Sequence, residues 1–319
     1  MSGIRDSYLG VSFSSNCIYF TELEEDAGKV ILDHVETVKA DFNFEEDLAK
    51  LKSNNKALTN ISQEIQKYLN SRKKQFAKIS LTIGTSQAFM LITPLDFSEG
   101  KKSLSTKIYW ELSNYFPETY NDFIVNTYRL NSVMPCSKTD EYLLIAVQKN
   151  AIEFVKRIFR LCNQGLSIID IDHFAAEHIL RKNSMKNMEG KNVLLIGLKK
   201  GRFDFGLIEQ KKYKFYSYTR YNSAPEYNLA LIRKLNSILG SSYVRQPVDV
   251  LVLYGDEIRD DTVAALKKNS GMYDIKILNP FENIISSAEF LKNEDLRKSV
   301  YKYSAGCGVA MRSIRLKSA

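Results

Sequence analysis

The chain has 319 residues, of which 44% are hydrophobic and 26% are charged, and its formal net charge is +8. This length and balance are typical of a globular protein with more than one core. They argue against a membrane-spanning chain, because no apolar run approaches the roughly 20 residues that a spanning helix needs. The N-terminus lacks the charged start, apolar stretch and cleavage site of a signal peptide, so we expect a cytoplasmic protein.

The excess of positive charge is scattered along the chain. Its densest clusters, at residues 71–75, 199–202 and 312–319, are typical of solvated faces or loops. The last of them also suits a position near a membrane surface. The sequence contains no strand with the aromatic and basic signature of an RNA-binding domain, so we expect no nucleic-acid partner.

Residues that commonly bind metals are few and poorly spaced for that role. The cysteines lie far apart in the sequence, which favours free buried thiols over a zinc site or a redox pair. Two of the histidines are five positions apart on a predicted helix, so they do not share one face of it. We therefore expect no metal centre, and no motif of a hydrolase is present. The residues concerned are Cys17, Cys136, Cys162, Cys307, His34, His173 and His178.

The first part of the chain alternates between strand and helix patterns. Residues 6–23 read as a strand, a tight turn and a second strand, because apolar residues occupy every second position on either side of Ser14, Ser15 and Asn16. The following segments predict a strand at 30–42, a helix at 58–74 and a strand at 78–84.

Residues 92–165 predict a compact unit of strand, helix, strand, strand and helix. Its first helix carries Leu104, Ile108 and Leu112 on one face and ends at Pro117, as helices usually do before a proline. The loop around 134–137 joins the two later strands as a hairpin. The predicted segments are strand 88–97, helix 102–116, strands 122–130 and 141–149, and helix 150–165.

After a strand and helix at 166–180 and a polar loop at 181–190, the opening pattern of the chain returns. Residues 192–218 again predict strand, turn, strand and strand, which is an internal repeat of architecture. The remaining predicted segments are helix 229–239, strand 248–258, helix 260–271 stopped by Gly271, strand 273–278, turn 279–284 and helix 303–315.

The order of these landmarks resembles that of PilM, a family of actin-like type IV pilus assembly proteins related to the cell-division protein FtsA. "YLGVSFSSNCIYFTEL" at 8–23 looks like the family's first phosphate loop, and "VLVLYGDEI" at 250–258 stands at its adenosine loop. The most specific segment is 143–180, where strand, helix and glycine lead to a strand that ends in aspartate and an alanine-bearing helix. "IYWELSNYFPE" at 108–118 and "SAGCGVAMR" at 304–312 resemble the inserted and the closing helix.

This resemblance implies an α/β protein with an actin-like, ribonuclease H-like fold of two lobes around a central cleft. The first lobe would comprise residues 1–91 and 166–190, with an inserted subdomain of the SHS2 kind at 92–165. The second lobe would comprise 191–319, with its lid subdomain reduced to about 220–247.

In the family, ATP and magnesium lie in the cleft, held by two loops that carry aspartates and glycines. Magnesium requires hard oxygen ligands, and phosphate requires converging N–H groups. Here Ser12 and Leu195 stand where the aspartates belong, and Ser14 stands where a glycine belongs, while Gly197 is retained.

We therefore expect a pseudo-ATPase in which the nucleotide-loop positions are remnants and neither ATP nor magnesium is bound. The remnant positions are Ser12, Ser14, Gly197, Gly201 and Gly255. A cleft filled by Tyr19, Leu195 and Leu198 would be the sign of a lost site. The reduced lid supports the same prediction, because sites for nucleotides bury most of the ligand.

An active ATPase is the alternative. Asp204 and Asp256 lie near the right loops and could replace the missing carboxylates, but we expect Asp204 to point elsewhere and Asp256 to be remote from the phosphates. The cations of 199–202 could hold a phosphate without a metal, although solvent is their expected surrounding.

The predicted function is that of a non-catalytic scaffold of a pilus-like assembly machine. The resemblance implies that it binds the cytoplasmic N-terminal tail of a PilN-like inner-membrane protein in a groove beside the inserted subdomain. We expect the helix with Ile108, Trp110 and Leu112 and the adjoining strands to line that groove, with Trp110 as an aromatic anchor unless it packs in the core.

A role in a type II secretion or cell-division complex is the other alternative left open by the sequence. In each case other inner-membrane components would be partners. The protein would meet the membrane only indirectly, because the C-terminal segment is short and weakly amphipathic.

Overall fold

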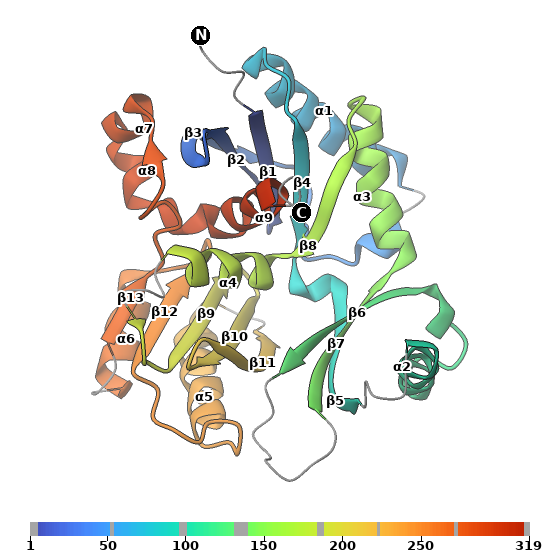
Figure 1. Ribbon diagram of the computed structural model, residues 1–319, viewed down its shortest axis with the longest axis vertical. Helices are drawn as coiled ribbons and strands as arrows, with labels where there is room; N and C mark the ends of the chain where they lie inside the picture. Colours follow the sequence, from blue (N-terminus) through green and yellow to red (C-terminus); the bar gives the residue numbers. More distant parts are fainter. Residues whose placement is uncertain are drawn as a thin grey trace.

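The computed structural model describes residues 6–51, 54–95, 101–130, 140–183, 188–221, 224–270 and 274–315. Two lobes, each built on one sheet, lie above and below a central helix, and a smaller three-stranded sheet stands beside the lower lobe (Figure 1). The predicted hairpin loop around 134–137, with Cys136, and the helix stop at Gly271 lie outside the described residues. No helix in the described part of the chain is long and apolar enough to cross a membrane.

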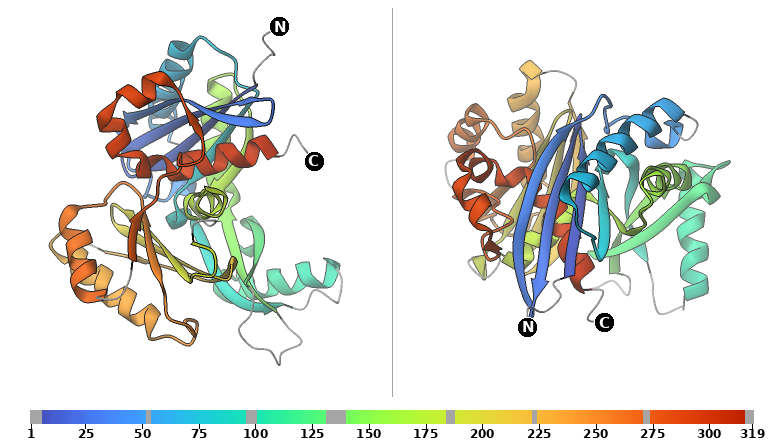
Figure 2. Two further views of the ribbon diagram at one scale, coloured as in Figure 1. Left: turned by 60° about the vertical axis from the view of Figure 1, so that its left-hand side comes forward. Right: turned by 90° about the horizontal axis from the view of Figure 1, so that it is seen from above.

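The first lobe contains a sheet whose strand order is β14-β3-β2-β1-β4-β8. Its centre is β1, which pairs antiparallel with β2 and parallel with β4. Helices α1 and α3 pack together on one face, while α4 and α9 pack together on the other (Figure 2). The bounds are β1 Asp6–Ser14, β2 Cys17–Asp26, β3 Lys29–Lys39, β4 Lys78–Ile83, β8 Leu166–Ile171, β14 Ile285–Ser286, α1 Asn55–Arg72, α3 Lys149–Leu161, α4 Asp172–Asn183 and α9 Ser304–Arg315.

The second lobe repeats this arrangement in the order β11-β10-β9-β12-β13. Its central strand β9 pairs antiparallel with β10 and parallel with β12, as β1 does with β2 and β4. The internal repeat that the sequence predicted is therefore confirmed. The bounds are β9 Val193–Lys199, β10 Arg202–Glu209, β11 Lys212–Arg220, β12 Val250–Tyr254, β13 Asp274–Ile277, α5 Tyr227–Leu239 and α6 Asp260–Ser270.

The inserted subdomain is the sheet β5-β7-β6 with one helix, α2. Leu112 of α2 packs against Phe123, Leu144 and Ala146, which fixes α2 on one face of this sheet. The bounds are β5 Ala88–Leu95, α2 Lys101–Tyr115, β6 Phe123–Leu130 and β7 Asp140–Gln148. Short connecting elements complete the described chain: α7 Ala288–Lys292, α8 Glu294–Lys298, and the 3-10 turns Leu48–Leu51, Thr85–Gln87, Tyr120–Asp122, Ala224–Glu226 and Val300–Tyr303.

The structure corrects three of the predicted domain boundaries. The end of the chain returns to the first lobe, since β14 pairs with β3 and α9 packs on β1, β2 and β4, so 191–319 is not one lobe. Helix α3 packs on α1 and belongs to the first lobe as well. The inserted sheet begins at Ala88, which precedes the predicted start. These boundaries depend on which sheet covers an apolar helix face, and periodicity within one element does not contain that information.

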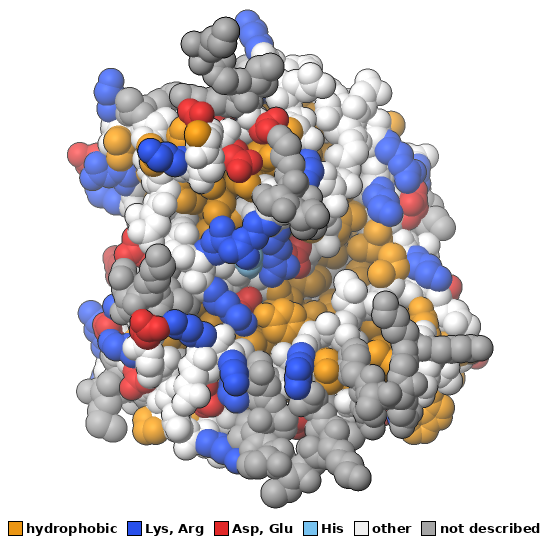
Figure 3. Space-filling view, viewed as in Figure 1, with side chains coloured by type: hydrophobic (Ala, Val, Ile, Leu, Met, Phe, Trp, Pro, Cys, Tyr) orange, Lys and Arg blue, Asp and Glu red, His pale blue; other side chains and the backbone are white. Residues whose placement is uncertain are grey.

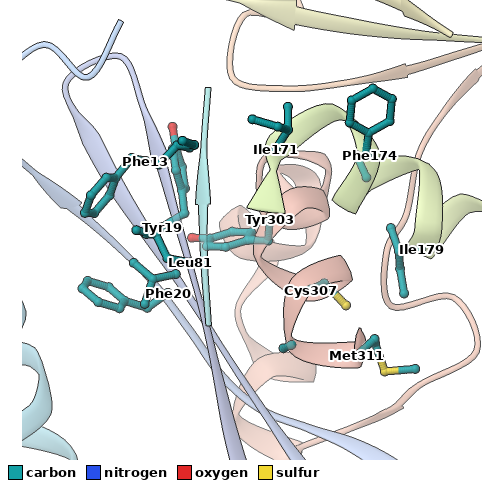
Figure 4. Packing of buried hydrophobic residues seen from close by; sticks show 14 of the residues in the cluster. Phe13, Tyr19, Phe20, Leu81, Ile171, Phe174, Ile179, Tyr303, Cys307 and Met311 are labelled. Carbon is teal, nitrogen blue, oxygen red and sulfur yellow. The ribbon is translucent and has the colours of Figure 1, made fainter. Parts of the chain in front are cut away.

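Helix α9 closes the core of the first lobe. Figure 4 shows Tyr303, directly before α9, pointing toward Tyr19 of the first hairpin, while Cys307 and Met311 of α9 point to the side of Ile179 on α4. Its glycines allow this close packing, because a Cβ at Gly306 would crowd Thr21 and one at Gly308 would overlap the carbonyl oxygen of Ala175.

We predict that Gly308→Ala destabilises the protein by about 1–3 kcal/mol, the usual range for overpacking a core. The loss would come from the contact with α4 and would exceed the better helix propensity of alanine. Gly165→Ala is the matched control, since a Cβ there meets nothing within 4 Å. Urea unfolding of both variants measures the difference, and equal midpoints would contradict the close packing of α9.

Candidate functional site

The three loops that the sequence assigned to nucleotide binding meet one another between the lobes. Ser14, at the end of β1, donates a hydrogen bond to Oδ2 of Asp256 at 2.9 Å. The ammonium of Lys199 donates to Oγ of Ser14 at 3.3 Å. The backbone N–H of Glu257 donates to the carbonyl of Leu198 at 3.0 Å. The loops therefore bond directly to each other.

A buried group of charges, the interlobe ion cluster, lies next to these loops. It consists of Glu45, Asp172, Lys199, Arg202 and Asp204. Asp172 begins α4 in the first lobe, and Nη2 of Arg202, from the second lobe, contacts its Oδ2 at 2.6 Å. Nε of Arg202 lies 3.2 Å from Asp204, and Nη1 lies 3.6 Å from Glu45. The side chains of Arg202 and Lys199 are only 1% exposed.

The charge states in the cluster follow from burial and from Arg202. Burial opposes ionisation of Asp172, but Arg202 and Lys199 outweigh it and hold the pKa of that carboxyl below its ordinary value. For Asp204, burial together with the nearby charge of Asp172 raises the pKa to about 6, although Arg202 opposes the change. Asp172 is thus the principal anionic partner of Arg202, in agreement with the shorter distance.

Aromatic rings cover the second-lobe side of the cluster. The hydroxyl of Tyr254 lies 2.9 Å from Nδ1 of His173, and the hydroxyl of Tyr216 donates to Oδ1 of Asp204 at 2.8 Å. Burial lowers the pKa of His173 to about 3, so its ring is neutral at physiological pH. The ring of Tyr254 lies so close to Gly197 that a Cβ there would be 2.7 Å from its hydroxyl oxygen.

Local contacts and backbone angles explain why glycine occupies the three nucleotide-loop positions at Gly197, Gly201 and Gly255. Gly197 leaves room for Tyr254. Gly255 has φ +117 and passes over the backbone of Leu198, and Gly201 has φ +81 in the turn between β9 and β10. Ser12 is 1% exposed in the middle of β1, and its hydroxyl has no hydrogen-bond partner. The structure thus brings Ser14, Gly197 and Gly255 to one place, while Ser12 lies inside the sheet.

Several expectations about these loops are corrected by the structure. Lys199 and Arg202 are buried rather than solvated, because carboxylates of the other lobe surround them. Asp204 faces the cluster, and Asp256 contacts the first loop through Ser14. The expectation that Tyr19, Leu195 and Leu198 would fill the cleft of a lost nucleotide site is wrong. These three side chains belong to the cores of the lobes, and charged groups lie between the loops.

The residues between the lobes do not fit a magnesium–phosphate group. A bound phosphate would have to lie next to the hydroxyl of Ser14. That hydroxyl already donates a hydrogen bond to Asp256 and accepts one from Lys199. Asp172, the carboxylate best placed to meet a cation, already holds Arg202. A magnesium–phosphate group placed here would compete with these buried bonds, and leaving a charge unpaired in such a place costs several kcal/mol.

The sequence missed the partners Asp172, Arg202 and Glu45. One signal was available: an aspartate directly follows the strand at 166–171, and two lysines and an arginine lie at the turn of the second lobe. Only the tertiary fold, however, brings these segments together.

A second site, the apolar groove, lies between the first lobe and the inserted sheet and encloses about 110 Å³. Hydrophobic side chains gather along a hollow in this face of the molecule (Figure 3). Strands β8 and β6, which contribute to its walls, each stand last in the strand order of their sheet. The lining residues are Ile83, Ile124, Asn126, Ile145, Val147, Ile152, Ile169, Asp170, Ile171 and Phe174.

The predicted groove residues on α2 lie elsewhere. Leu112 is fully buried under α2, and Ile108 packs beside it. Trp110 is 63% exposed and lines an open hollow on α2 together with Tyr109 and Tyr120, so it does not pack in the core. Residues of β6 and β7 alternate between the two faces of the sheet: Leu144 meets α2, while Ile145 lines the groove. The apolar groove is therefore on the face of the sheet opposite α2.

Comparison with solved structures identifies the fold of this chain. A chain of a PilM–PilN type IV pilus biogenesis complex matches with a TM-score of 0.78 and 13% identity over 96% of this chain and 98% of that chain. A Bacteroides thetaiotaomicron protein with an actin-like ATPase fold and unknown function matches with a TM-score of 0.51 and 12% identity, over 86% and 91% of the two chains. The chain has the actin-like fold, similar to that of PilM. No protein-family model and no curated protein matches the sequence.

We predict that Arg202→Met destabilises the protein by about 3–5 kcal/mol, because it removes the guanidinium that pairs with the buried carboxyl groups of Asp172 and Asp204. Arg220→Met is the matched control, since Arg220 is exposed and stands opposite Arg202 in the ladder of β10 and β11. Chemical unfolding of the two variants gives the comparison. An Arg202→Met protein as stable as the control would show that the cluster contributes little.

Proposed function

We propose that this protein is a non-catalytic scaffold that binds the cytoplasmic N-terminal tail of a PilN-like inner-membrane protein in the apolar groove. The observation that carries this proposal is the groove itself, an apolar hollow between two sheets in a chain whose fold is similar to that of a PilM–PilN complex component. Binding would hold the protein at the inner membrane through its partner, together with other components of a pilus-like machine.

The shape of the groove favours an extended peptide with aliphatic anchors. Its volume equals that of about four water molecules in the liquid, which suits one or two aliphatic side chains rather than a helix. Because β8 and β6 are edge strands, each has backbone groups on one side that no strand of its own sheet uses. An extended segment can add main-chain hydrogen bonds at such an edge while its side chains fill the pockets.

The state of the cleft supports the non-catalytic part of the proposal. In the ATPase alternative, Asp204 or Asp256 would bind magnesium, but Asp204 is engaged with Arg202 and Asp256 accepts a hydrogen bond from Ser14. The scaffold would then keep its lobes together with its own side chains and present the groove without a nucleotide.

Partner binding is tested with a synthetic peptide of the N-terminal cytoplasmic segment of the PilN-like protein from the same genome. We expect the wild-type protein to bind it, and Ile124→Asp to weaken binding at least tenfold, because the new carboxylate would be desolvated against an apolar anchor. Ile124 is 45% exposed, so the variant is expected to fold. Isothermal titration calorimetry measures both affinities.

Trp110→Ala serves as the comparison in the same titration. It removes the exposed aromatic side chain on the opposite face of the inserted sheet and is expected to leave affinity unchanged. The reverse result, with loss only in Trp110→Ala, would move the partner to the hollow on α2. Absence of any binding to the wild-type protein would overturn the proposed function.

We further predict that Mg·ATP does not raise the melting temperature of the protein. A ligand that binds only the native state stabilises it by RT ln(1 + [L]/Kd), so a titration up to millimolar nucleotide would reveal even weak binding. Differential scanning fluorimetry with Mg·ATP, and with EDTA as a control, makes the measurement. A rise in melting temperature that depends on dose and on magnesium would contradict the non-catalytic reading.

A further inference from the structure

A group of cations on α4 and α9, the basic rim, extends away from the groove wall and is made of Arg181, Lys182, Arg312 and Arg315. The first two belong to α4 and the last two to α9, which pack together. Figure 3 shows a cluster of Lys and Arg side chains beside the apolar hollow, over the region of these helices. The following inference rests on the proposed function of the groove and concerns the chemistry of the segment bound there.

One rim cation contacts residues of the groove directly, and a second reaches the groove wall through Tyr128. Arg312 pairs with Oδ2 of Asp170 at 2.5 Å and donates to the carbonyl of Phe174 at 2.8 Å, and both of those residues line the groove. Arg181 donates to the hydroxyl of Tyr128 at 3.3 Å, and the ring of Tyr128 stacks on Phe174. The rim is thus continuous with the groove wall.

The rim has more positive than negative charge. Arg312 pairs with Asp170 and Arg181 pairs with Glu177, so two of its cations are balanced. Within the ranges that the structure describes, Lys182 and Arg315 have no carboxylate at ion-pair distance. Burial, with Arg312 and Arg315 adding to it, lowers the pKa of His178 to about 3. Burial and Arg315 also lower the pKa of Lys182. The lowered pKa values of His178 and Lys182 both agree with an uncompensated positive potential at the basic rim.

We propose that the segment bound in the groove carries an aspartate or glutamate next to its apolar anchors, and that this carboxylate pairs with Lys182 and Arg315 at the basic rim. Acidic groups of a partner would balance the two unpaired cations, which is the usual complementarity of interface charges. Lys182 is half-buried and Arg315 is exposed, so both are open to a side chain of the bound segment.

The test compares two synthetic peptides: the tail of the PilN-like protein and the same tail with every Asp and Glu replaced by Asn and Gln. Each is titrated against the wild-type protein and against Lys182→Gln/Arg315→Gln. The acidic tail should bind the double variant about tenfold more weakly than the wild type at low salt, and the difference should shrink at high salt. The neutral tail should bind both proteins equally.

Lys267→Gln/Lys268→Gln is the matched control, because it removes two exposed lysines of α6 in the second lobe and changes the net charge equally. It should leave the affinity for the acidic tail near that of the wild type. A tail without any acidic residue, or an acidic tail that binds wild type and rim variant equally, would overturn the inference while leaving the proposed function intact.

Vesicles of phosphatidylcholine with and without phosphatidylglycerol form the last arm. We expect no rim-dependent binding to either. If the rim variant loses binding to the anionic vesicles while its affinity for the tail is unchanged, the rim recognises a membrane surface and the inference fails. If no tail binds the wild-type protein at all, the proposed function itself has failed, which is a separate result.

Discussion

The contact on which this architecture depends is the buried ion pair between Asp172 of the first lobe and Arg202 of the second, at 2.6 Å. Neither side chain is more than 1% exposed, so neither charge can be satisfied by bulk water. A buried pair of this kind adds little net stability compared with an apolar pair, yet each partner is costly to leave alone. Its effect is therefore on geometry: the lobes are held at the separation at which both charges, and those of Lys199 and Asp204, have partners.

Much of the fold could be predicted because it depends on local patterns of apolar and polar residues along the chain. The alternation at Leu9, Val11 and Phe13 and its return at 192–218 predicted two equivalent sheets, and the structure has them in the same strand order. The order of motifs predicted an actin-like fold, which the similarity to PilM supports. What periodicity could not give was the return of α9 to the first lobe, since an apolar helix face does not indicate which of two sheets will cover it.

The candidate site was predictable in position but not in chemistry. The loops at Ser14, Gly197 and Gly255 do meet, because the fold brings them together whatever side chains they carry. Lysine and arginine in a turn are normally solvated, so Lys199 and Arg202 were expected in water. They are buried because Asp172 and Glu45, which lie in the other lobe and far away in the sequence, approach them, and charge pairing across the lobes is a tertiary property. The apolar groove escaped prediction for a similar reason, since Ile145 and Leu144 are adjacent in sequence and lie on opposite faces of one sheet.

The groove and the interlobe cluster share one short segment, the junction of β8 and α4. Along it, Asp170 and Ile171 line the groove, Asp172 binds Arg202, His173 meets Tyr254, and Phe174 returns to the groove. A displacement of Asp172 would therefore move the groove wall on either side of it. Fixing this segment with internal charges removes one source of mobility from the groove. This suits the proposed binding of a peptide, because a site that is already ordered loses less conformational entropy when it binds. An internal ion pair between the lobes is thus a physical means of keeping the adjoining groove in shape.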